Sequence, residues 1–107
     1  MNLILALNYG SRNEITIAFN KLMKKYKNKK INIKENNISE NLFTKNIPDP
    51  DLLIRTSGEK RISNFLLWQL AYTEFVFLDV LWPDFKKKNF TYAINKYSKR
   101  KRRYGSR

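Results

Sequence analysis

The sequence predicts an α/β fold built on a parallel sheet, and three observations support this. Short apolar runs fit buried strands, longer stretches carry apolar residues at helical spacing, and the two kinds of segment alternate along the chain. Strands separated by helices usually pair in parallel, and about three strands with flanking helices are expected. Since parallel strands normally have both faces covered, the chain is expected to be part of a larger sheet.

The first elements are a strand and two helices. Residues 3–7 are an apolar run before the turn at Gly10, which predicts a buried strand. Residues 13–26 carry apolar side chains at helical spacing, which predicts an amphipathic helix with Asn13 or Ser11 near its cap. After a basic linker at 24–34, a short helix is expected over 35–43. Its predicted caps are Asn37 or Ser39.

The remaining elements follow Pro48 and Pro50, which stiffen the approach to a second buried strand at 51–55. Residues 56–61 then form a loop. A helix is predicted over 63–72, apolar almost all round and therefore buried. Further elements are a strand over 74–78, a run over 80–82 that closes on Pro83, and a helix over 90–97 that continues into a basic tail at 98–107.

Length and composition limit the classes of protein. With 107 residues, the chain 1–107 is expected to be a single domain with one core. It contains no Cys, hence no disulfide or thiolate metal site, and no His, the usual general base and transition-metal ligand. No run approaches the length of a membrane span. The apolar N-terminal stretch lacks a basic lead-in and a cleavage site, which favours a strand over a signal peptide.

The formal net charge is +13 and the sequence pI about 10.1. Such a charge favours nucleic acid, an anionic membrane surface or phosphorylated substrates as partners. An AT-rich genome also produces Lys and Asn enrichment without selection for binding, so the placement of the Arg residues is more informative. The charge is dispersed and no nucleic-acid motif occurs, so no nucleic-acid partner is expected.

A phosphate site is predicted around the loop at 56–61. Arg55 ends a predicted buried strand, at the sheet edge where ligands gather. Arg61 and Ser63 lie at the start of the predicted helix, whose free N–H groups favour anions. Arg donates two-pronged bonds to phosphate oxygens, and Gly58 lets the backbone approach the ligand. The alternatives are a plain helix cap at Ser63 and surface or ion-paired arginines.

Glu74 enters the strand that follows the predicted helix. A carboxylate close to a diphosphate is suited to a magnesium ion, which binds one or two carboxylates together with phosphates and waters. A solvated or salt-bridged glutamate is the alternative.

Four stretches resemble one enzyme family. They are Asn-Tyr-Gly-Ser-Arg-Asn-Glu-Ile at 8–15, nearly all of 50–74, Trp-Pro-Asp-Phe at 82–85, and Arg-Tyr-Gly at 103–105. The chain resembles the C-terminal part of the cis-prenyltransferases, the family of undecaprenyl diphosphate synthase. The resemblance covers essentially the whole chain, most loosely at 21–46.

The resemblance implies a function and a set of site residues. Family members condense isopentenyl diphosphate onto an allylic diphosphate with cis geometry to make polyprenyl diphosphates, using Mg²⁺. The positions that match those holding isopentenyl diphosphate are Arg55, Arg61, Ile62 and Ser63, and Glu74 matches a magnesium-associated carboxylate. Arg103 and Gly105 match a terminal motif that reaches the partner's site in a homodimer; a disordered basic end is the alternative. The family is cytoplasmic, with contact to the membrane surface.

The departures from the family pattern concern mainly what the sequence lacks. Gly10-Ser11-Arg12 replaces Gly-Gly-Arg, and Lys60 stands where His is common. The segment Asp-Gly-Asn-x-Arg-Trp, which carries the catalytic and magnesium-binding Asp, does not occur, nor does Phe-Ser-x-Glu-Asn-Trp. No catalytic residue is therefore assigned, and the chain is expected to be a truncated fragment with little or no activity. Two other hypotheses are a non-catalytic partner subunit of a prenyltransferase and a small basic nucleic-acid-binding protein.

Overall fold

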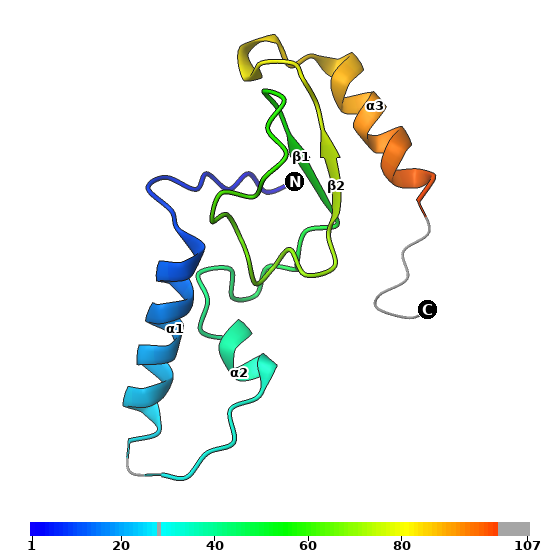
Figure 1. Cartoon of the computed structure of the whole chain (residues 1–107). Coiled ribbons are helices and arrows are strands. Elements are labelled where there is room, and N and C mark those ends of the chain that lie inside the picture. The colour runs from blue at the N-terminus through cyan, green and yellow to red at the C-terminus, as the bar shows by residue number, and fades with distance from the viewer. Residues whose placement is uncertain (28, 101–107) are drawn as a thin grey trace. The chain divides into compact units, whose positions relative to one another are not determined.

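The structure of the protein is a computed structural model that describes residues 1–27 and 29–100. The chain forms two compact units, each with its own elements and buried residues. The first comprises Met1–Pro48 together with Ser63–Trp68, and the second comprises Asp49–Ile62 together with the chain from Gln69 onward. Figure 1 shows the order of the elements along the chain.

The first unit contains helices α1 (Ser11–Lys25) and α2 (Glu35–Ser39), which pack together. The side chains of Glu14, Ala18 and Leu22 recur every fourth residue, so they share one face of α1, and all three are buried. Lysines in the last turn of α1 stabilise the helix, because their positive charge lies near the negative end of the helix dipole. The predicted helix at 13–26 is confirmed, but it begins at Ser11.

The helix caps differ in detail from the predicted ones. Gly10, and neither Ser11 nor Asn13, is the N-cap of α1. Helix α2 is shorter than the predicted 35–43. It ends at Ser39, and the chain then continues in turns up to residue 47. The N-cap of α2 is Lys34, and neither Asn37 nor Ser39. Asn37 is the third residue of the helix, and its side-chain Oδ1 accepts the backbone N–H of Lys34 at 2.8 Å. Ser39 does not cap the start of α2. Its hydroxyl instead accepts the indole N–H of Trp68 at 3.0 Å.

The second unit contains a parallel pair of strands, β1 (Leu52–Arg55) and β2 (Glu74–Phe77). A 3₁₀ helix η1 (Trp82–Asp84) and helix α3 (Lys87–Ser98) follow, and α3 contacts β2 (Figure 1). The buried apolar residues are Leu70, Val76 and Ala93. The predicted strands at 51–55 and 74–78 and their parallel pairing are confirmed. The last helix is longer than the predicted 90–97.

The predicted strand at 3–7 is wrong. These residues form neither helix nor strand, and Leu3 and Leu7 are each 82% exposed. A strand exists only where a neighbour accepts its backbone hydrogen bonds. Among the described residues the sheet consists of β1 and β2 alone, so residues 3–7 have no such neighbour, and the sheet has two strands where about three were expected.

The predicted helix at 63–72 is also wrong. The chain runs through turns there, and Ser63, Asn64 and Leu66 have positive φ angles of 52°, 61° and 47°. Left-handed residues cannot continue a right-handed helix. The segment is instead held by hydrogen bonds to residues far away in the sequence.

Candidate functional site

The structure brings Arg55 and Arg61 together at the carboxyl end of β1. The guanidinium Nη1 of Arg55, the last residue of the strand, donates to the carbonyl oxygen of Arg61 at 2.6 Å. A guanidinium has five N–H donors in a fixed fork, so this bond leaves donors that can face an oxyanion. The two cationic residues predicted from the sequence thus lie at the two ends of one short loop.

The loop between them is held by backbone hydrogen bonds. The N–H of Ser57 donates to the carbonyl of Val80 at 2.8 Å, and that of Gly58 to the carbonyl of Leu78 at 2.9 Å. Both Ser57 and Gly58 have φ of 68°, in the left-handed region. A Cβ on Gly58 would lie 3.2 Å from Oδ1 of Asp79. The loop therefore turns tightly back onto the chain that leaves β2, and Gly58 serves this turn.

Arg61 is ion-paired at the surface, as the alternative prediction held. Its Nη1 lies 2.6 Å from Oε2 of Glu59, and its side chain is 66% exposed. An exposed ion pair contributes little free energy and is screened by salt. An incoming diphosphate can therefore compete with Glu59 for this guanidinium.

Ile62 is half-buried and Ser63 is exposed. Because no helix begins at Ser63, the predicted helix N-terminus is not available to an anion there, and Ser63 is not a helix cap either. The contribution that Ser63 can still make to an anion is its hydroxyl group.

Glu74 lies at the opposite end of the strand pair from Arg55. In the parallel register Glu74 is level with Leu52, whereas Arg55 is level with Phe77. Three residues of strand correspond to about 10 Å. The structure therefore does not place this carboxylate beside the arginine at the carboxyl end of β1.

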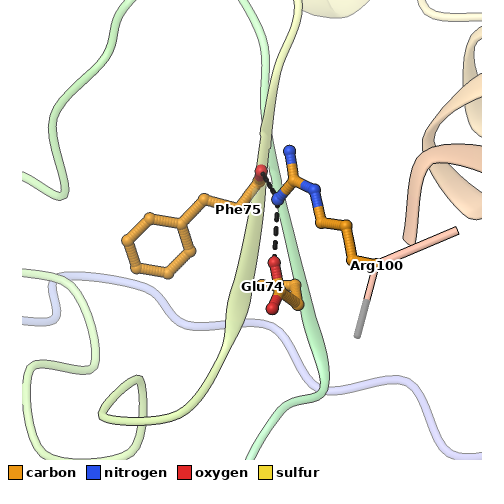
Figure 2. A network of polar contacts seen from close by, with 3 residues as sticks. All are labelled: Glu74, Phe75 and Arg100. Carbon is orange, nitrogen blue, oxygen red and sulfur yellow. Dashed lines mark hydrogen bonds and ion pairs between the residues drawn. The ribbon is translucent and has the colours of Figure 1, made fainter. Parts of the chain in front are cut away.

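The carboxylate of Glu74 is paired with the guanidinium of Arg100 (Figure 2). Nη1 of Arg100 lies 2.9 Å from Oε2 of Glu74 and also donates to the carbonyl oxygen of Phe75 at 2.8 Å. Both side chains are partly exposed. The contacts tie Arg100, two residues beyond the end of α3, to the start of β2, so the salt-bridged alternative for Glu74 is what the structure contains.

Glu74 is the one carboxylate that the sequence analysis assigned to magnesium. Within 1–27 and 29–100 no three His, Cys, Asp or Glu side chains lie close enough together to hold a metal ion. Glu74 offers a single carboxylate, and that carboxylate already has a cationic partner. The predicted tail residues Arg103 and Gly105 lie outside the described residues.

Several residues of the first unit were missed by sequence reasoning. Glu14 is fully buried and accepts the hydroxyl of Tyr9 and the backbone N–H of Phe43, the latter at 2.8 Å. Asn64 and Ser11 hold the start of α1 against the turn at 63–67. A carboxylate on the apolar face of a predicted helix was the available signal for Glu14. The contacts of Asn64 span more than fifty residues and leave no local pattern.

Comparison with known proteins identifies the class. Residues 1–105 match the family model described as putative undecaprenyl diphosphate synthase, and the chain belongs to this family. No helix among the described residues has the length and apolar character needed to cross a membrane.

The most similar relatives include an isoprenyl transferase of Thermotoga maritima, 53% identical over 106 residues, which are 98% of this chain and 46% of the relative. The ditrans,polycis-undecaprenyl-diphosphate synthase of Micrococcus luteus, specific for (2E,6E)-farnesyl diphosphate, is 50% identical over 108 residues, covering 98% of this chain and 43% of that protein. The chain thus spans less than half the length of these relatives.

Solved structures agree with this assignment. The lavandulyl diphosphate synthase of Lavandula x intermedia, in complex with dimethylallyl diphosphate, superposes with a TM-score of 0.86 at 40% identity, covering 94% of this chain and 45% of that one. A probable undecaprenyl diphosphate synthase from Campylobacter jejuni gives 0.80 at 37% identity, covering 94% and 46%. The family resemblance inferred from the sequence motifs is confirmed.

Proposed function

We propose that this chain supplies the isopentenyl diphosphate site of a cis-prenyltransferase and corresponds to the C-terminal part of that enzyme. The observation that carries the proposal is the bond from Arg55 to the carbonyl of Arg61, which gathers two guanidinium-bearing residues at the end of β1. Family membership supports the choice of a prenyl diphosphate over other anions. By likeness to the family, Ile62 and Ser63 complete the contacts.

In the proposed reaction the π electrons of isopentenyl diphosphate form a bond to the allylic carbon while the allylic diphosphate leaves. A proton is then lost and the chain is one isoprene unit longer. The contribution of Arg55 and Arg61 is to hold the acceptor's diphosphate and so orient its double bond. The Asp-Gly-Asn-x-Arg-Trp segment, to which the family resemblance assigns the allylic diphosphate, does not occur in this sequence, so we expect no prenyl transfer by the 107-residue chain alone.

Glu74 and the tail have proposed roles that depend on the complete enzyme. Glu74 is a candidate for contact with the Mg²⁺ that the family uses, provided that it exchanges its Arg100 partner. Arg103 and Gly105 are candidates for reaching the site of a second copy in a homodimer. A cytoplasmic enzyme in peripheral contact with the membrane is the setting that the family suggests.

Isothermal titration of the purified chain with isopentenyl diphosphate tests the proposal. We expect binding that Arg55→Ala weakens by on the order of 2–5 kcal/mol, the cost of removing one partner of a close charge pair. Lys96→Ala is the matched control, since it removes an equally cationic side chain from α3 of the same unit. Equal affinities of the wild-type and Arg55→Ala chains would refute the role of Arg55.

A further inference from the structure

Helix α1 begins without a side-chain cap of its own. Its N-cap is Gly10, which has extended backbone angles and no side chain that could accept a hydrogen bond. The first N–H groups of a helix have no partner within the helix and need an acceptor from elsewhere. The acceptor for α1 therefore has to come from another segment.

Asn64 supplies the missing acceptors from the same compact unit. Its backbone carbonyl accepts the N–H of Ser11 at 2.8 Å, and its side-chain Oδ1 accepts the N–H of Arg12 at 2.9 Å. Arg12 is the second residue of the helix, a position that a capping side chain commonly serves. Asn64 thus accepts the hydrogen bond that an N-cap side chain would accept, although it follows Arg12 by 52 residues.

The fit between the two segments is close and reciprocal. The hydroxyl of Ser11 is fully buried and accepts the N–H of Leu67 at 2.9 Å, so each segment accepts a bond from the other. A Cβ on Gly10 would lie 3.1 Å from Nδ2 of Asn64, so a larger residue at position 10 would press on this side chain. Gly10 therefore leaves the space that the exposed side chain of Asn64 occupies beside the start of α1.

The backbone that carries Asn64 is conformationally unusual. Ser63 and Asn64 have consecutive positive φ angles of 52° and 61°. Asn tolerates this conformation better than most residues, whereas Ser has no such preference. The bonds from α1 to Asn64 compensate for holding Ser63 in the left-handed region.

We infer that Asn64 is a positioning residue, which caps α1 from a distance and thereby fixes the backbone of Ser63 for its contact with the diphosphate of isopentenyl diphosphate. The inference rests on the proposed function for the ligand, but the capping role depends only on the contacts above. It also means that the N–H groups of Ser11 and Arg12 are not available to bind a phosphate.

The test uses two variants of the 107-residue chain. Asn64→Gly keeps the positive φ accessible but removes the side-chain acceptor, whereas Asn64→Asp keeps an acceptor oxygen, and a carboxylate is favourable at a helix N-terminus. Asn89→Ala is the matched control, because Oδ1 of Asn89 accepts the N–H of Lys86 at 2.8 Å in the local cap of α3. The readouts are the hydrogen-exchange rate of the Arg12 amide and the Kd for isopentenyl diphosphate.

In Asn64→Gly we expect the Arg12 amide to exchange roughly five- to tenfold faster, and the Kd to rise by a similar factor, as for loss of a capping bond. Asn64→Asp should restore both, and Asn89→Ala should change neither. Unchanged exchange in Asn64→Gly, or failure of Asn64→Asp to restore it, would overturn the cap. Faster exchange with an unchanged Kd would overturn the positioning role. If the wild-type chain does not bind isopentenyl diphosphate, the proposed function fails, whereas the exchange rates still decide the cap.

Discussion

Glu14 shows how one buried side chain holds the first unit together. Its carboxylate accepts the hydroxyl of Tyr9, which precedes α1, and the N–H of Phe43, which follows α2. Both bonds are partly buried, and a donor that loses its acceptor away from water retains the cost of its desolvation. We expect Glu14→Ala to lower the free energy of unfolding by on the order of 2–4 kcal/mol, measured by urea denaturation.

Glu40→Ala is the control for that measurement. Glu40 is an exposed carboxylate that accepts a bond from the side chain of Asn36 within the same turn. Its removal should change the free energy of unfolding by less than about 0.5 kcal/mol. Equal effects of the two substitutions would show that Glu14 has no special role in the fold.

Tyr9 gives the first unit a pH dependence at the alkaline end. Burial, and then its hydrogen bond to Glu14, raise the pKa of the Tyr9 hydroxyl above its ordinary value of about 10. The folded state therefore favours the protonated phenol. The resulting stabilisation is fully present below pH 10 and is lost as the pH rises through the folded-state pKa. We expect the stability difference between wild type and Tyr9→Phe to shrink above pH 10, and a constant difference from pH 8 to 11 would contradict this.

At the scale of elements, the loop after β1 depends on two adjacent left-handed residues. Ser57 and Gly58 share a φ of 68°, but only Gly58 is free of the Cβ penalty there. Gly58→Ala should destabilise the chain by about 1–2 kcal/mol, and its new Cβ would also approach Asp79. Ser57→Gly should stabilise it by roughly 0.5 kcal/mol, after the entropy of the added glycine is subtracted. Thermal unfolding measures both, and effects of the same sign would contradict this account.

Which elements were predictable follows from how local their causes are. Helix α1 and the two strands were predicted because apolar spacing and short apolar runs are properties of the segments themselves. The turn at 63–67 was not predicted, because the apolar residues from 65 onward also fit a buried helix, and because the hydrogen-bond partners of the turn lie on α1. The strand at 3–7 failed for a related reason, since strand formation depends on a neighbouring strand.

The candidate site was predicted in part for the same reason. Arg55 and Arg61 were found because a strand end and a short loop place them together locally. Glu74 also follows directly from its strand, but its separation from Arg55 depends on the parallel register, and its pairing depends on Arg100. The position of Glu74 relative to Arg55 and its pairing with Arg100 therefore depend on contacts between distant segments, which the sequence pattern does not reveal.

At the scale of the whole molecule, the chain matches less than half of each relative, although the match covers nearly all of the chain itself. The end of β1 and the loop after it hold the two arginines proposed to bind isopentenyl diphosphate, and the described residues hold no group of three metal ligands. The proposal that follows is a division of labour within one enzyme. In this proposal the chain binds the acceptor, and the remainder of the enzyme acts on the allylic donor.

The most direct test is a prenyl-transfer assay on a chimera in which this chain replaces the matching segment of the Micrococcus luteus synthase. With farnesyl diphosphate, labelled isopentenyl diphosphate and Mg²⁺, we predict product at a rate within about tenfold of the parent, since the chain would supply an equivalent acceptor site. The same chimera with Arg55→Ala should lose roughly 100-fold or more in kcat/KM. A folded chimera that makes no product, or an Arg55→Ala chimera as active as its parent, would contradict the account.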